Sequence, residues 1–170
     1  MMTYNPIAMS ALAADVVSFE NAIPTTTIWV SPTGSDLNSG SETSPFKTIQ
    51  AAVKMAKPGT AIMVKEGTYT ENVDLMGRSG TADLPIWIVS ADGKGAANIV
   101  AASADRPVVL GYGVNNLVIK GFELVGGTEG IKLTQSGINL TKLVNSVVIE
   151  DNIVHGLNHP LIFPYYISTT

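Results

Sequence analysis

The sequence predicts an all-β protein, a parallel β-helix of about four turns whose N-terminal end is capped by an α-helix. Three observations predict this fold class: short apolar segments with alternating polarity, two segments that repeat at a fixed spacing, and one amphipathic helix directly before a strand. Of the 170 residues, 45% are hydrophobic and only 14% are charged. A chain of this length and composition forms one domain with a buried core.

The capping helix is predicted over residues 44–57. Ser44 is a suitable N-cap residue, and Pro45 suits the first helical position because no N–H group is needed there. Apolar residues then recur at helical spacing on one face: Phe46, Ile49, Ala52, Val53 and Ala56. A Pro-Gly pair ends the helix, and a strand over residues 61–65 follows at once. We expect the helix to cover the first turn of a stacked β-structure.

An internal repeat in the last third of the chain gives the period of the coil. Residues 117–124 (Leu-Val-Ile-Lys-Gly-Phe-Glu-Leu) align with residues 147–154 (Val-Val-Ile-Glu-Asp-Asn-Ile-Val) at an offset of 30 residues. The expected inward positions are Leu117, Ile119, Phe122 and Leu124, then Val147, Ile149, Asn152 and Val154. A fixed period of this size with short strands is typical of a solenoid. The missing crossover helices argue against a doubly wound sheet, and the missing Asn-Gly turns argue against a sandwich.

The asparagine of the second copy supports stacking. Its counterpart is Phe122, which occupies a buried type of position, and a buried amide needs hydrogen-bond partners. We expect Asn152 to bond backbone groups of its own and neighbouring turns. The alternative is an ordinary turn asparagine. Further strands are predicted at residues 28–30, 68–75, 85–90, 98–100 and 107–110.

Composition excludes several classes of function. The net charge is −4 and no run of Lys or Arg occurs, so we expect no nucleic-acid partner. The chain has no Cys, which excludes disulfides, thiolate metal sites and Cys nucleophiles. No apolar run reaches the ~18–20 residues of a membrane span. No P-loop, dinucleotide fingerprint or Gly-x-Ser-x-Gly motif is present.

The two ends of the chain do not follow the repeat. Residues 1–27 are interpreted as an N-terminal arm or the remnant of a secretory signal: Ala11-Leu12-Ala13 fits a cleavage site, although the basic n-region is missing. The β-helix is assigned to residues 28–156. Residues 157–170 form an atypical tail with two prolines and large apolar side chains. The tail is either an unusual cap, the result of truncation or a frame change, or a surface for self-association.

Several segments resemble a known family. Residues 29–36 (Trp-Val-Ser-Pro-Thr-Gly-Ser-Asp), 44–52 and 57–69 resemble the N-terminal cap and first rung of pectate-lyase-like proteins, and residues 80–88 resemble the second rung. The resemblance covers roughly residues 28–156. It implies a right-handed, single-stranded parallel β-helix related to polysaccharide lyases and alginate epimerases, and a secreted or periplasmic location. In such enzymes the catalytic and calcium-binding residues commonly sit on later rungs than this chain contains.

The resemblance also implies a chemistry and a set of candidate residues. Lyases of uronic-acid polymers neutralise a carboxylate, often with Ca²⁺, and remove the neighbouring proton with a base. On the outward face of the repeat we assign Lys120 and His155 as catalytic, Glu123 and Glu150 as substrate-binding, and Asp151 as a calcium ligand. Two alternatives stay open: Lys120 and Glu150, one rung apart, form an ion pair, and Asp151 belongs to a solvated turn.

Other side chains have a functional and a structural interpretation. Residues 36–40 (Asp-Leu-Asn-Ser-Gly) carry part of a calcium-loop pattern without its bidentate Glu, so a capping loop is favoured. His155 and His159 are four residues apart, but the flanking Gly and Pro argue against a helical metal pair. Trp29 and Trp87 would stack on sugar rings if exposed and otherwise pack structurally.

The function expected from these residues is action on an acidic polysaccharide by β-elimination or a related proton abstraction. The alternative is a non-catalytic β-helix that serves as a carbohydrate-binding, surface or structural module. A full cluster of acidic residues with a base on one outward face would favour the enzyme. The sequence pattern does not identify such a complete cluster.

Overall fold

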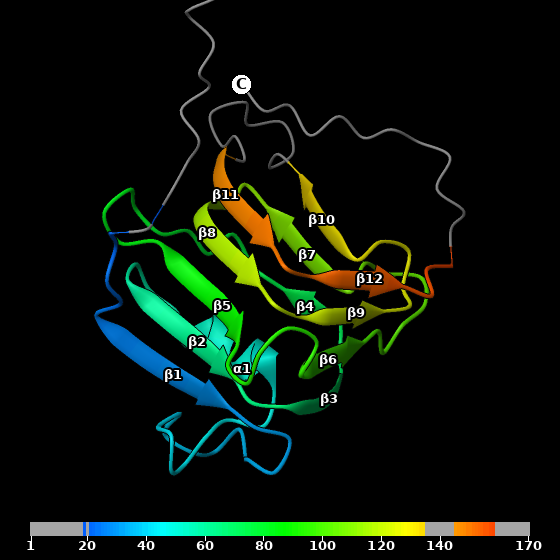
Figure 1. Cartoon of the computed structure of the whole chain (residues 1–170), viewed down its shortest axis with the longest axis horizontal. Coiled ribbons are helices and arrows are strands. Elements are labelled where there is room, and N and C mark those ends of the chain that lie inside the picture. The colour runs from blue at the N-terminus through cyan, green and yellow to red at the C-terminus, as the bar shows by residue number, and fades with distance from the viewer. Residues whose placement is uncertain (1–18, 20, 135–144, 159–170) are drawn as a thin grey trace, which may run out of the picture.

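The chain folds as a parallel β-solenoid of about four turns with one short helix (Figure 1). The computed structural model describes residues 19, 21–134 and 145–158. Every strand pair in the described part is parallel, and successive turns add one strand to each of three sheets. The predicted fold class is therefore confirmed.

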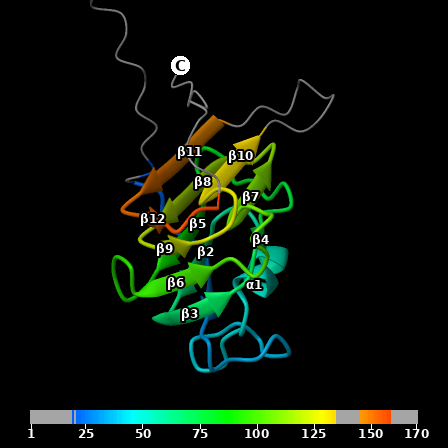
Figure 2. The same ribbon diagram turned by 90° about the vertical axis from the view of Figure 1, so that its right-hand side faces the viewer.

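The five-stranded sheet contains β1 (Thr26–Val30), β2 (Thr60–Val64), β5 (Ile86–Ser90), β8 (Asn115–Lys120) and β11 (Asn145–Glu150), in that order. The four-stranded sheet contains β3 (Gly67–Thr70), β6 (Ala97–Val100), β9 (Glu123–Val125) and β12 (Ile153–His155). The three-stranded sheet contains β4 (Val73–Asp74), β7 (Val109–Tyr112) and β10 (Ile131–Thr134). Figure 2 shows these sheets edge to edge around the coil.

The predicted strand over residues 68–75 is wrong, because the chain turns a corner in its middle. Residues 67–70 join the four-stranded sheet, and residues 73–74 join the three-stranded sheet. Asn72 holds this corner: its amide nitrogen donates to the carbonyls of Pro107 (2.9 Å) and Ser103 (3.2 Å), and its Oδ1 accepts from the Ser103 N–H (2.7 Å). These bonds tie one corner of the coil to the next.

The 30-residue repeat stacks in the predicted register. Leu117 pairs with Val147, and Ile119 pairs with Ile149. The four inward side chains of the first copy are all buried, with exposed fractions of 0–1%. Their counterparts Ile149 and Val154 are 46% and 45% exposed, because β11 and β12 are the outermost described strands of their sheets. At this end of the described coil, the inward side chains of the last rung are therefore more exposed than those of the rung before it.

Asn152 joins two rungs, as predicted. Its Oδ1 accepts from the Phe122 N–H (2.9 Å), and its Nδ2 donates to the Ile119 carbonyl (3.0 Å). The amide side chain therefore satisfies one backbone donor and one backbone acceptor of the rung below. The preceding residue, Asp151, has a positive φ of 56°, and Gly121 holds the equivalent corner one rung below with a φ of 81°.

The capping helix is shorter than the predicted range 44–57. Helix α1 spans Ile49–Met55, and its N-cap is Thr48, whose hydroxyl accepts from the Ala51 N–H (3.1 Å). Ser44 is not the cap, because residues 44–46 are extended: Phe46 forms a parallel bridge with Val30. The buried face of α1 is Ile49, Ala52 and Val53, and the helix lies against the end of the coil near β1, away from β11 (Figure 1).

Two carboxylates bind the amino end of this helix. Asp36 Oδ1 accepts from the N–H groups of Lys47 (3.0 Å) and Thr48 (2.9 Å). The Glu71 oxygens accept from the N–H groups of Ile49 and Gln50, each at 2.9 Å. The capping-loop interpretation of residues 36–40 is therefore confirmed. Burial raises the pKa of the Glu71 carboxyl above its usual range, although these two hydrogen bonds lower it.

A matched pair of substitutions tests the buried columns. Ile119→Ala removes a side chain that is 1% exposed, so we expect a loss of about 2–5 kcal/mol in unfolding free energy. Ile149 lies in the same column but is 46% exposed, so for Ile149→Ala we expect a loss of about 1 kcal/mol in unfolding free energy. Urea unfolding of both variants measures the difference. Equal losses would contradict the assigned burial of the column.

The Glu71 contact gives a pH-dependent prediction. A raised pKa means that the folded state binds the carboxyl proton more tightly than the unfolded state, so wild-type stability falls as pH rises through the raised pKa. Glu71→Gln cannot titrate. We expect the stability advantage of the wild type over this variant to shrink between about pH 4 and pH 7. Urea unfolding across that range checks the sign, and an advantage that grows with pH would contradict it.

Candidate functional site

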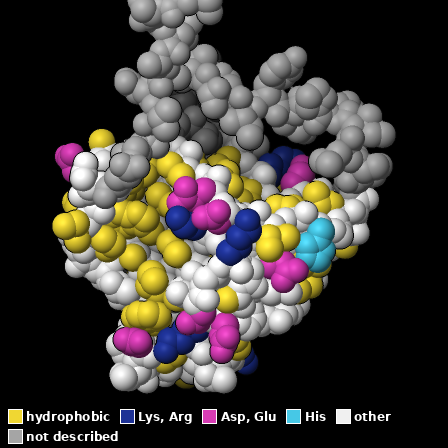
Figure 3. Space-filling view, in the orientation of Figure 1, with side chains coloured by type: hydrophobic (Ala, Val, Ile, Leu, Met, Phe, Trp, Pro, Cys, Tyr) yellow, Lys and Arg dark blue, Asp and Glu magenta, His cyan; other side chains and the backbone are white. Residues whose placement is uncertain are grey.

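One outward column of side chains runs across the whole five-stranded sheet. Its members are register neighbours on successive strands: Trp29, Met63, Val89, Lys120 and Glu150. The column is apolar on β1, β2 and β5 and charged on β8 and β11. Figure 3 shows hydrophobic side chains gathered over one part of this face and mixed acidic and basic side chains beside them.

Lys120 is held by two acids. Its Nζ lies 2.7 Å from Glu150 Oε1 and 3.6 Å from Asp151 Oδ2, so the ion-pair interpretation is confirmed. The hydrogen bond and charge of Glu150, supported by Asp151, raise the pKa of the Lys120 ammonium. A raised pKa keeps the lysine protonated, which suits the neutralisation of an anion better than the removal of a proton.

His155 forms a separate pair with Glu123 on the neighbouring four-stranded sheet. His155 Nε2 lies 2.7 Å from Glu123 Oε1, and both side chains are partly exposed. A carboxylate bonded to one ring nitrogen orients the imidazole and leaves Nδ1 as the nitrogen that can accept a proton. This arrangement is the one expected of an exposed general base and the group that positions it.

The structure brings the five assigned residues into two groups rather than one cluster: Lys120 with Glu150 and Asp151, and His155 with Glu123. Within the described residues, no hydrogen bond or ion pair joins Lys120 to His155. No group of three His, Asp or Glu side chains in this part of the chain could hold a metal ion. The catalytic, substrate-binding and calcium roles stay predictions. His159 and the tail from residue 159 onward lie outside the described residues.

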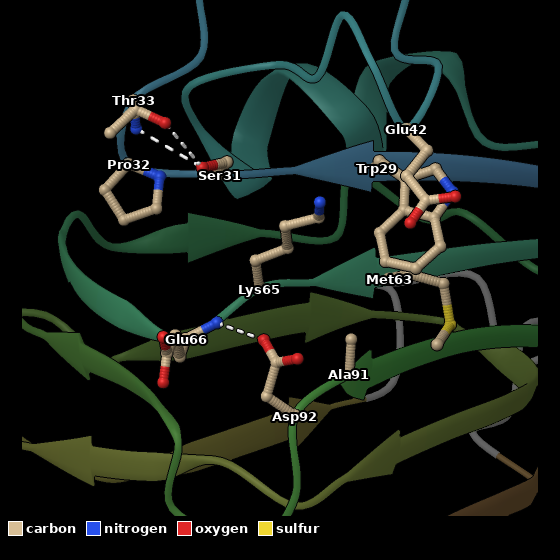
Figure 4. A pocket seen from close by; sticks show the side chains of 10 residues that line it. All are labelled: Trp29, Ser31, Pro32, Thr33, Glu42, Met63, Lys65, Glu66, Ala91 and Asp92. Carbon is tan, nitrogen blue, oxygen red and sulfur yellow. Dashed lines mark hydrogen bonds between the residues drawn. The ribbon is translucent and has the colours of Figure 1, made fainter.

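A groove near the capped end of the coil was missed by the sequence analysis. It has a volume of about 480 Å³ and is lined mainly by the ends of β1, β2 and β5 and the loops after them. Its principal side chains are Trp29, Ser31, Glu42, Met63, Lys65 and Asp92. Figure 4 shows Lys65 pointing into the groove between Trp29 and Ser31. Strand alternation identifies Trp29 as outward, but only the three-dimensional register brings Lys65 and Asp92 beside it.

Known proteins share this architecture. A family model described as a protein of unknown function (DUF1565) matches residues 32–76. Pectate lyase PEL9 of Emericella nidulans is 38% identical over 68 residues, and pectate lyase L of Dickeya chrysanthemi is 35% identical over 92 residues. The crystal structure of pectate lyase Pel9A superposes on 81% of this chain with a TM-score of 0.60 and 19% identity. The chain is a distant relative of the pectate-lyase-like β-helix proteins.

A further relative of this pectate-lyase-like chain is the uncharacterized protein YwoF of Bacillus subtilis (strain 168), which is 30% identical over 138 residues and 76% of the chain. A rhamnogalacturonan lyase structure covers 59% of the chain with a TM-score of 0.50 and 23% identity. The chain spans 29% of YwoF, 17% of PEL9, 22% of pectate lyase L and 36% of the Pel9A structure. Among the described residues, no helix has the length and hydropathy needed to cross a membrane.

Proposed function

We propose that this pectate-lyase-like protein acts on an acidic polysaccharide by β-elimination or a related proton abstraction. The observation that supports the proposal is the partly exposed His155–Glu123 pair, in which His155 Nε2 lies 2.7 Å from Glu123 Oε1. Two pectate lyases among the relatives support the substrate class. A secreted or periplasmic location is part of the same proposal.

The proposed step uses the paired side chains in separate roles. His155 Nδ1 takes the proton from the carbon next to the uronate carboxylate, the released electron pair forms a C=C bond, and the bond from the next carbon to the glycosidic oxygen breaks. The leaving oxygen takes a proton from water, and the hydroxide that forms takes the proton back from the imidazolium. Glu123 holds the imidazole in place through its contact with Nε2. The substrate carboxylate displaces Glu150 from the Lys120 ammonium, which then neutralises the substrate charge, and the two glutamates accept bonds from sugar hydroxyls.

The proposed step does not use calcium. Both Asp151 and Glu150 face the Lys120 ammonium, which occupies the position that a cation between them would need. Two carboxylates already paired with a lysine do not fit the six to eight oxygen ligands that Ca²⁺ prefers. A role for Asp151 in calcium binding therefore requires that the ion pair open first.

The test is the ultraviolet absorbance of unsaturated product when the protein is incubated with pectate or alginate, with and without calcium. We expect product from one of these polymers and a loss of about 10²–10⁴-fold in rate for His155→Ala. Lys47→Ala, which changes an exposed lysine near the capping helix, serves as the control and should keep the wild-type rate. An unchanged rate in His155→Ala would contradict the assignment of the base.

A second candidate function is a non-catalytic carbohydrate-binding, surface or structural module. The observation that favours it is the closed Lys120–Glu150 ion pair, whose raised lysine pKa opposes proton removal by that residue. A folded protein that retains pectate or alginate in affinity electrophoresis but yields no new absorbance would support this candidate over the enzyme.

A further inference from the structure

The groove beside Trp29 is separate from both charged pairs, since it lies near the capped end of the coil and they lie on the last described rungs. We propose that this groove binds a neutral sugar residue of a polysaccharide, with Trp29 as the stacking surface. The inference goes beyond the proposed function, because it concerns recognition of a different sugar at a different place and requires no turnover.

Trp29 provides an apolar surface that the fold cannot bury. It lies between the inward residues Ile28 and Val30 on β1, so its indole ring must point outward, where it is only half-buried. The Lys65 ammonium lies 5.2 Å from the centre of this ring, within the range of a cation–π contact. A sugar ring has apolar C–H faces and a polar edge, so it matches an indole surface flanked by hydrogen-bonding groups.

Lys65 and Glu42 keep hydrogen-bonding capacity for a ligand, and a sugar that stacks on the ring face below Lys65 must move the ammonium aside. Within the described residues, the Lys65 ammonium and the Glu42 carboxylate make no hydrogen bond or ion pair. Asp92 is fixed in place, because its Oδ2 accepts from the Glu66 N–H at 2.7 Å (Figure 4). Each sugar hydroxyl can donate and accept, so a lining with both carboxylates and an ammonium can satisfy it.

The charge of the lining decides between a neutral and an acidic sugar. The groove is lined by three acidic residues, Glu42, Glu66 and Asp92, and by one lysine, Lys65. The net charge of the groove is therefore negative, and like charges disfavour a uronate carboxylate at this position. A neutral unit, which meets no such repulsion, is the chemistry that fits.

The two tryptophans of the chain give a direct probe. Trp87 lies outward on β5 but does not line the groove, so Trp87→Phe leaves Trp29 as the sole indole fluorophore. We would titrate this variant with oligosaccharides of galactan, arabinan and xyloglucan, and with oligogalacturonate. The expected result is a saturable change in Trp29 emission with a neutral oligosaccharide and none with oligogalacturonate at equal concentration. Flat titrations for all neutral oligosaccharides, or preference for oligogalacturonate, would overturn the proposal.

Charge variants in the same Trp87→Phe background separate the contributions. Glu42→Gln weakens one acceptor and should reduce neutral-sugar affinity by about two- to tenfold. Glu42→Lys neutralises the groove and should allow oligogalacturonate to bind. Asp83→Asn, an exposed acid outside the groove lining, is the matched control and should change neither affinity.

These readouts are independent of turnover. His155→Ala should keep the Trp29 response whether or not the lyase assay gives product, so failure of one proposal is distinguishable from failure of the other. Unchanged affinities in both Glu42 variants would contradict the assigned contact.

Discussion

Each turn of this coil is held by parallel stacking in register with the turn before it. A coil of this kind buries an inward side chain between two rungs, or between a rung and the capping helix, so each turn must present apolar groups at the same positions as the turn before it. Ile119 is 1% exposed between Ile88 and Ile149, whereas Ile149 is 46% exposed. The amide of Asn152 fits the same rule, because it bonds the backbone of the rung below rather than leaving a buried polar group unpaired.

The capped end shows how a stacked coil can be closed. Helix α1 places Ile49, Ala52 and Val53 against the core, and its free N–H groups are bound by Asp36 and Glu71. A helix this short has little stability of its own, so packing and capping hold it in place. Fixing α1 also fixes the loop between β1 and the helix, and that loop contributes Glu42 to the Trp29 groove.

The sequence predicted the features that depend on periodicity and failed on those that depend on distant partners. The repeat at 30 residues gave the pairing of Leu117 with Val147 and the role of Asn152. The start of α1 was placed too early, because Phe46 pairs with β1 and Glu71 binds the helix from the next turn of the coil. The Trp29 groove could not be seen for the same reason, since register rather than local pattern brings three strand ends together.

The outward column from Trp29 to Glu150 and the neighbouring His155–Glu123 pair both depend on the register of the stacked strands. The chain has no Cys, and Val118 and Val148 are neighbours on the outer face of β8 and β11. Adjacent strands lie about 4.8 Å apart, within the range that a disulfide spans. Mild oxidation of the Val118→Cys, Val148→Cys double variant should therefore form an intramolecular disulfide, detected by mass and by gel mobility. The Val118→Cys, Val147→Cys double variant, whose side chains face opposite sides, should stay reduced. Oxidation of the second variant in preference to the first would contradict the account.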